Sequence, residues 1–373
     1  MIRKFRYKNI LLYASHQWCG NTKEYFIKNT EKLAVFLLMP RIQTRDNILR
    51  IYEKGKLVKT EQTPLTANFF LYYLFWYYHY IVTIFKHFSR NKKLIVITAH
   101  PYVFFAMTIQ KLLRKIDFVY YIADYYPPIN ITLRLYEKLK RFYHKGIRYK
   151  IYLGDGVNKI MNGKVIESDT CKTIMLGVNP KNIKRNIENE KTLSTILFVG
   201  VVRPNVGLDI IYRFLRENKE FKLNVIGICD KELYKIHREM IKKIGIDSRV
   251  YFPNRFFFDE ELNEVSKTCF VGIALYSIDD TSTIYYADPG KVKTYTEMGL
   301  PVIMSNTSSI APYIRKYKAG EVIDRDSKSL KKAIDRIREN YSLYVKGVAL
   351  LNKEFYYETY YGVKFSFLED AFK

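Results

Sequence analysis

The feature that most restricts the fold is a repeated alternation between short apolar segments and amphipathic ones. The apolar segments lie at 9–14, 33–38, 93–98, 118–122, 150–153, 173–176, 195–199, 221–228, 250–252, 271–275, 301–304 and 321–323. Segments with helical spacing lie between them, at 103–114, 133–144 (with Lys and Arg expected outside), 208 onward and 231–244. Strands that alternate with helices of about 10–15 residues predict parallel sheets built from βαβ units.

The alternation stops once and then starts again, which divides the chain. Residues 178–194 are polar and charged, and they carry almost no large apolar side chains. The 373 residues suffice for two domains of ~150 residues each. We therefore expect an α/β protein with two Rossmann-like, doubly wound domains that face each other across a cleft. The first would span 1–180 and the second 181–345, and a helical tail at 346–373 would pack back on the first.

The cysteine pattern and the hydropathy narrow the class further. Four scattered cysteines form no CxxC pair, which predicts neither a disulfide framework nor a structural zinc site and favours a reducing cytoplasm. The basic start of the chain has too short an apolar run for a signal peptide. The segment 69–85 is short for a membrane span and rich in tyrosine, so we expect a helix that is buried or interfacial.

Three stretches of the second half, in this order, carry a recognisable pattern. They are FVGVVRPNVGLD at 198–209, VYF at 250–252 with a polar loop and EEL at 260–262, and ADPGKVKTYTEMGLPVI at 287–303. They are preceded by LGVN at 176–179. Together they resemble the nucleotide-sugar half of GT-B glycosyltransferases of the group 1 kind, in the variant found in enzymes that build bacterial surface polysaccharides such as capsule or exopolysaccharide.

The resemblance implies a hexosyltransferase that moves a sugar from a nucleotide-diphosphate donor to a glycan acceptor. The first domain would bind the acceptor and the second the donor, a UDP-sugar rather than a GDP-sugar. It implies no metal and no further cofactor. The donor-binding positions that it implies are Gly20, Gly200, Arg203, Gly207, Asn254, Arg255, Asp288, Lys291, Thr294 and Glu297.

The diphosphate would be held largely by two cations, because this chain departs from the family at two positions. Val206 stands where many relatives have a lysine, so Arg203 and Lys291 would carry the phosphates. An arginine fork suits phosphate, and the free N–H groups of a helix that begins near 289–291 would add to it. Thr294 stands where relatives have a glutamate, so the ribose contact stays open between Thr294 and Glu297.

Each of these positions also has a structural interpretation. The two glycines, at 200 and 207, fit an ordinary βα turn, and an isolated arginine is often solvated. Asp288 would serve as a helix N-cap, and Glu297 as part of a solvated helix face. Asn254 and Arg255 fit an ordinary loop as well as a base pocket.

The first half offers two candidates for a catalytic base. Asp124 and His100 each follow a predicted strand, so both should lie at the carboxyl edge of the sheet. Histidine is best matched to neutral pH. A base is needed if the reaction inverts the sugar's configuration and is not required if the reaction retains it. The structural alternatives are a loop cap for Asp124 and a hydrogen-bonded core histidine for His100.

The net charge of +25, from 62 basic and 37 acidic residues, suggests an anionic binding partner. Basic clusters at 3–8 and 138–150, together with the aromatic segment 69–85, favour an anionic membrane surface. We therefore expect a cytoplasmic protein, peripheral on the inner face of the plasma membrane, with a lipid-linked acceptor. Nucleic acid is not expected as a partner, because the charges are spread and no RNA-binding motif occurs. The alternatives that stay open are a nucleotide-sugar 2-epimerase and a basic RNA-binding protein.

Overall fold

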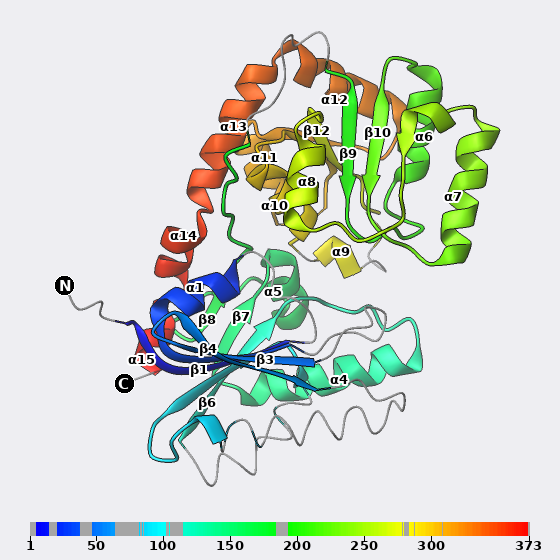
Figure 1. Cartoon of the computed structure of the whole chain (residues 1–373). Helices are drawn as coiled ribbons and strands as arrows, with labels where there is room; N and C mark the ends of the chain where they lie inside the picture. Colours follow the sequence, from blue (N-terminus) through cyan, green and yellow to red (C-terminus); the bar gives the residue numbers. More distant parts are fainter. Residues whose placement is uncertain are drawn as a thin grey trace. The chain divides into compact units, whose positions relative to one another are not determined.

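The computed structural model divides the chain into two compact units. It describes residues 5–14, 21–37, 47–63, 82, 84, 86–101, 104, 115–183, 193–277, 279, 283–286, 288–307 and 309–371. The first unit comprises Met1–Leu176 and Tyr357–Lys373, and the second comprises Gly177–Tyr356 (Figure 1). Gly20, nearly all of the helix expected at 103–114 and all but two residues of the segment 69–85 lie outside the described residues.

The first unit is built on an eight-stranded sheet with the order β4-β3-β2-β1-β5-β6-β7-β8. Its strands are β1 (Tyr7–Ala14), β2 (Thr30–Leu37), β3 (Asn47–Glu53), β4 (Lys56–Thr63), β5 (Leu94–Thr98), β6 (Ile116–Ile122), β7 (Tyr149–Tyr152) and β8 (Cys171–Thr173). Six of them run parallel, and β3 and β4 form an antiparallel hairpin at one edge. The parallel strands are those that the apolar segments predicted.

The hairpin was not among the predicted elements. Its strands, NILRIYE and KLVKTEQT, contain no run of more than two apolar residues. The turn places Lys54 and Gly55 at positive φ, 51° and 83°. Lys56 and other charged side chains line the edge strand β4, as is usual at exposed sheet edges.

Helices α1 (Thr22–Asn29) and α4 (Ile131–Gly146) lie on opposite sides of this sheet (Figure 1). The unit also contains α5 (Asp155–Asn162), α14 (Tyr357–Lys364) and α15 (Phe367–Ala371). The two last helices join the N-terminal residues through buried aromatic contacts. Tyr7 donates a hydrogen bond to the carbonyl of Phe365 at 3.1 Å, and the rings of Tyr25 and Tyr361 lie 5.7 Å apart. The returning tail thus belongs to the core of the first unit.

The second unit has a six-stranded, fully parallel sheet in the order β11-β10-β9-β12-β13-β14. Its strands are β9 (Thr195–Val199), β10 (Lys222–Ile226), β11 (Val250–Tyr251), β12 (Val271–Ala274), β13 (Val302–Ser305) and β14 (Gly320–Ile323). The strand order reverses at β9, the first strand of the unit. By the switch-point rule, a ligand is expected outside the carboxyl ends of β9 and β12.

Helices surround the strands of this sheet (Figure 1). They are α6 (Leu208–Glu217), α7 (Lys231–Lys243), α8 (Asp259–Ser266), α9 (Thr283–Tyr286), α10 (Gly290–Glu297), α11 (Ala311–Tyr317), α12 (Ser327–Glu339) and α13 (Tyr341–Glu354). Helix α13 packs on α10, α11 and α12, which is why the returning tail begins at Tyr357 and not at residue 346. Within the described part of the chain, no helix has the length and apolar character that crossing a membrane requires.

Candidate functional site

Glycines bring three chain segments together at the carboxyl edge of the second sheet. Gly200 follows β9 with φ 110°, and its amide donates to the carbonyl of Ile226 at 3.0 Å. A Cβ on Gly227 would collide with the Gly200 carbonyl. Gly207 precedes α6 with φ 81°, and a Cβ there would lie 2.6 Å from that of Leu275. Gly200 is required by its backbone conformation, Gly227 by lack of space, and Gly207 by both.

Tyr295, on α10, joins the ends of the two central strands. Its hydroxyl donates to the carbonyl of Ile273 at 2.9 Å and accepts from the amide of Val199 at 2.8 Å. Its ring occupies the space in which Gly272 would carry a side chain. This tyrosine was not among the residues expected at the site from the sequence. Its only local signal is its spacing, one helical turn after Lys291.

Lys291 places its ammonium group over Gly200. The side chain is half-buried, with the ammonium 4.0 Å from the ring centre of Phe198 and 4.9 Å from that of Tyr276. Its Cε would be 3.7 Å from a Cβ on Gly200. Burial, and then the nearby charge of Arg203, lower the pKa of Lys291 from 10.5 to about 7.

Arg203 lies in the exposed loop between β9 and α6, near enough to Lys291 for its charge to act on that pKa. Within the described residues, neither cation forms an ion pair with a carboxylate. Helix α10 begins at Gly290, one residue before Lys291, and Pro289 occupies its N-cap position. Two cations and a helix N-terminus thus meet at one edge without an anion of the described chain between them. This arrangement suits a diphosphate.

Glu297 and Thr294 lie further along α10. The Glu297 carboxylate accepts a hydrogen bond from the amide of Asn179 at 2.7 Å, and its carbonyl accepts from Lys181 at 2.7 Å. Glu297 therefore holds the segment that enters the second unit, and the interpretation as a solvated helix face is wrong. The Thr294 hydroxyl donates to the carbonyl of Gly290 at 3.1 Å. Neither observation assigns the ribose contact.

Asp288 is buried at the start of this segment, with 3% of its surface exposed. Because Pro289 is the N-cap residue of α10, Asp288 does not fill that position. Its charge opposes the effect of burial on the neighbouring Lys293, whose pKa falls to about 8. The Lys293 ammonium lies 3.5 Å from the ring centre of Phe355. Asp288 thus lies among buried charges behind the edge that carries Lys291.

Asn254 and Arg255 lie in the loop between β11 and α8 and contact neighbouring segments of the second unit. Asn254 has φ 49° and accepts a hydrogen bond from the amide of Cys229 at 2.8 Å. Arg255 pairs with Glu261 at 2.7 Å, and its guanidinium stacks 3.9 Å from the ring centre of Phe257. These contacts order the loop, and a role in donor binding stays a prediction.

The candidate base Asp124 lies in the first unit, just after β6. The Tyr126 hydroxyl is 3.5 Å from its carboxylate, and the Lys140 ammonium donates to its carbonyl. Glu137 accepts from the amide of Tyr126 at 2.9 Å and pairs with Lys140 at 2.9 Å. This buried pair on α4 fixes the backbone of the loop that carries Asp124.

His100 lies two residues after β5, the strand beside β6. Its amide donates to the hydroxyl of Thr98 at 3.1 Å, and it is half-buried. Because Thr98 pairs with Tyr120 in the register of these strands, His100 and Asp124 follow neighbouring strand ends. The structure therefore brings both candidates to one edge of the first sheet, and their catalytic roles stay predictions.

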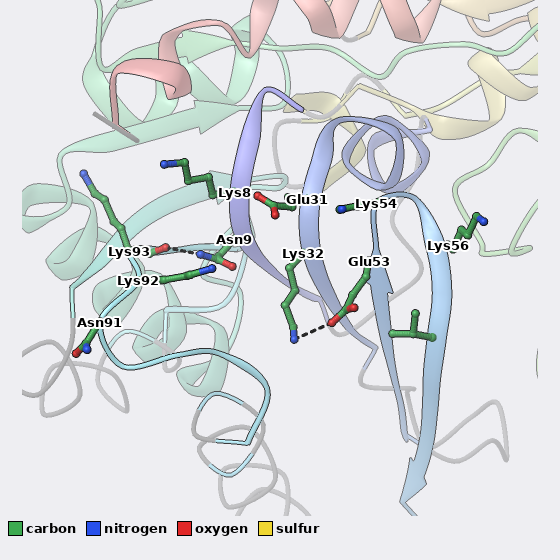
Figure 2. Close-up of a pocket in the computed structure, with 11 residues that line it drawn as sticks. Lys8, Asn9, Glu31, Lys32, Glu53, Lys54, Lys56, Asn91, Lys92 and Lys93 are labelled. Carbon is green, nitrogen blue, oxygen red and sulfur yellow. Dashed lines mark hydrogen bonds and ion pairs between the residues drawn. The ribbon is translucent and has the colours of Figure 1, made fainter. Parts of the chain in front are cut away.

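A pocket of about 960 Å³ lies at the opposite, amino-terminal edge of the first sheet (Figure 2). It is lined by Lys8, Asn9, Glu31, Lys32, Glu53, Lys54, Lys56, Val58, Asn91, Lys92 and Lys93. Lys32 and Glu53 form an ion pair at 2.8 Å (Figure 2). None of the predicted site residues lines it. Among the described residues, no group of three or more His, Cys, Asp or Glu side chains could hold a metal ion.

Comparisons with known proteins identify the fold. No family model matches the sequence, and no curated protein does. Among solved structures, sucrose-phosphate synthase from Thermosynechococcus elongatus superposes with a TM-score of 0.72 at 12% identity, over 98% of this chain and 99% of that one. Anabaena HepE in complex with UDP and glucose gives 0.67 at 12% identity, over 97% and 99%. A glycosyltransferase from Rickettsia africae gives 0.66 at 14% identity, over 98% of each chain. These likenesses confirm the fold of GT-B glycosyltransferases.

Proposed function

We propose that the protein is a GT-B glycosyltransferase that moves a sugar from a UDP-sugar to a glycan acceptor. The observation that carries this proposal is the pair Arg203 and Lys291. Both are free of carboxylate partners in the described chain, Lys291 lies beside Gly200 at the first turn of α10, and the charge of Arg203 acts on Lys291. The solved structures of similar fold include HepE complexes with UDP and with UDP-glucose. A UDP donor is therefore the best-supported choice.

The chemistry follows from the charge that grows on the leaving diphosphate. As the bond between the sugar and the phosphate breaks, negative charge accumulates on the phosphate oxygens. Arg203 offers a planar fork for two oxygens, and Lys291 adds a point charge in a partly dry site where its effect is large. The free N–H groups at the start of α10 add a third stabilising element. These groups accelerate the reaction because they bind the leaving group more tightly as it becomes charged.

The acceptor would be activated by the first unit. For an inverting reaction, Asp124 or His100 takes the proton of the attacking hydroxyl. For a retaining reaction, the leaving phosphate takes it and neither side chain is a base. The rigid loop after β6, held by Glu137 and Lys140, supports Asp124 as the residue with the better-defined position.

A lipid-linked acceptor in polysaccharide biosynthesis, used at the inner face of the plasma membrane, completes the proposal. The support is the net charge of +25, which attracts a protein to anionic headgroups. The 2-epimerase alternative is not favoured, because His237, the only histidine of the second half, is buried on α7 against Tyr212 and Phe252. No observation favours RNA binding.

The direct test is UDP binding by calorimetry, followed by turnover with a panel of radiolabelled nucleotide sugars, with and without membrane lipid extract. Arg203→Ala and Lys291→Ala should each weaken UDP binding by about tenfold or more, the usual loss for one charged contact. Arg213→Ala is the matched control, because Arg213 is exposed on α6 and pairs with Asp209 at 2.7 Å. Normal UDP binding in both variants would refute the donor site. Interconversion of free nucleotide sugars without transfer would favour an epimerase.

A further inference from the structure

Helix α4 exposes three of its large apolar residues to solvent and buries two of its charged residues against the protein. Glu137 and Lys140 are 4% and 3% exposed, whereas Ile131, Leu135 and Phe142 are 75%, 60% and 69% exposed. At ~100° per residue, the three apolar side chains fall within an arc of ~40°. They form a stripe along the outer face, which we call the α4 stripe. An exposed apolar stripe and two buried charges both depart from the pattern expected for a helix that covers a sheet.

Contacts on the inner face explain how two charged side chains of α4 are buried. Glu137 and Lys140 pair with each other and bind the backbone of Tyr126 and Asp124. The helix is oriented by these polar contacts and by the rings of Tyr136 and Tyr143, which lie 5.6 Å from Tyr126 and 5.7 Å from Phe104. Rotating the helix to bury the α4 stripe would break these contacts.

A row of positive charges runs beside the α4 stripe. Four exposed cations follow the same helical spacing, at Arg134, Lys138, Arg141 and Lys145. On the wheel they occupy the ~60° next to Ile131. None of the four forms an ion pair within the described residues. The one acidic residue of the helix is the buried Glu137. The outer face is thus apolar and cationic only.

We infer that α4 lies flat in the headgroup layer of an anionic bilayer, with the α4 stripe inserted and the cationic row against lipid phosphates. This combination is the signature of interfacial helices. A protein partner would need a surface that is both apolar and acidic, whereas anionic lipid supplies both properties over any area. Ile129, 71% exposed just before the N-cap Asn130, extends the apolar surface at one end.

The structure divides the basic cluster at 138–150 between exposed and buried positions. The basic cluster at 138–150 was expected to lie outside as a whole, but Lys140 is buried and Lys150 is half-buried on β7. The inference rests on the proposed function only in linking the bilayer to a lipid-borne acceptor. Because the inner face of α4 holds the loop of Asp124, docking would place this loop within about one helix diameter, ~10 Å, of the headgroups.

The test is flotation of the full-length protein with vesicles of phosphatidylglycerol and phosphatidylcholine, and with vesicles of phosphatidylcholine alone. We expect binding to the anionic vesicles only. Leu135→Ser with Phe142→Ser should weaken it by about tenfold or more, since both side chains would leave the lipid. The control Leu350→Ser with Val363→Ser changes residues 55% and 74% exposed on α13 and α14. This control should float like the wild type.

The charge row is tested in the same way. Lys138→Gln with Lys145→Gln should reduce binding to anionic vesicles, whereas Lys242→Gln with Lys243→Gln, at the exposed end of α7, should not. Equal flotation of the α4 variants and their controls would overturn the inference. So would self-association of the protein without vesicles that Leu135→Ser abolishes, which would assign the face to a second copy. UDP binding, measured without vesicles, reports on the donor site separately, so the two proposals fail independently.

Discussion

Raising the pH from 7 to 9 should weaken UDP binding strongly, because the ammonium of Lys291 is held near its titration point. Burial against Phe198 and Tyr276, and the charge of Arg203, lower the pKa of this lysine to about 7. At neutral pH about half of the free protein therefore carries a neutral amine at this position. A bound diphosphate favours the charged form and raises the pKa again. Donor binding should thus take up a proton.

The sign and size of the effect follow from this linkage. Below pH 7 the lysine is already protonated and UDP binds at full strength. Above pH 7 a growing fraction must first take a proton, so the dissociation constant rises by up to tenfold per pH unit. Between pH 7 and pH 9 the loss is about 50-fold, or about 2.3 kcal/mol. The terminal phosphate of UDP, with a second pKa near 6, is ionised throughout this range and adds little.

Calorimetric titrations of UDP at pH 7, 8 and 9, in buffers of different ionisation enthalpy, measure both the affinity and the proton uptake. Lys291→Arg is the matched control, because a guanidinium stays charged over this range. Its affinity should be nearly independent of pH. A wild-type affinity that changes less than about threefold would refute the reasoning. A slope that persists in Lys291→Arg would assign the proton to another group, and Lys293, with a pKa of about 8, is the nearest candidate.

Three further changes test the packing around the two candidate edges by urea unfolding. Gly207→Ala should lower the free energy of unfolding by about 2–4 kcal/mol, because its Cβ would meet Leu275. Its control is Gly163→Ala, which has the same φ of 81° but nothing within 4 Å and should cost only about 1 kcal/mol; equal losses would contradict the steric explanation. Lys140→Met should cost about 3–5 kcal/mol by leaving Glu137 buried and unpaired, and adding Glu137→Gln should recover part of it; no recovery would argue against the pair. Tyr295→Phe should cost about 1–3 kcal/mol, because the amide of Val199 and the carbonyl of Ile273 lose their partner; wild-type stability would show that water replaces the hydroxyl.

The parallel strands could be predicted because their signal is local. The segment 195–199 is a continuous apolar run, and it forms β9 at the same residues. Such runs are typical of strands buried on both faces. The hairpin β3–β4 gave no such signal, since its strands contain no run of more than two apolar residues and Leu57 and Val58 are exposed at the edge. Pairing that covers only one face leaves a weaker pattern in the chain.

In the candidate donor site, too, some features could be predicted from the sequence and others depend on tertiary contacts. Gly200 and Gly207 were found from the sequence because they stand in the motif at 198–209, and both have the positive φ that favours glycine. The lowered pKa of Lys291 could not be found, because it depends on Phe198, Tyr276 and Arg203, which lie in other segments. The bridging role of Tyr295 likewise depends on two strands that meet only in the folded sheet.

Helix α4 shows most clearly which features local sequence predicts and which depend on tertiary contacts. Periodicity alone predicted a helix at 133–144, and the structure has one at Ile131–Gly146. The cations were expected outside, and all are exposed except Lys140, but Ile131, Leu135 and Phe142 are exposed beside them. The polar partners of Glu137 and Lys140 come from the loop after β6, and a helical pattern carries no information about which neighbour will meet which face. Local periodicity determines that a segment is a helix, whereas contacts between distant segments determine which side of it faces the protein.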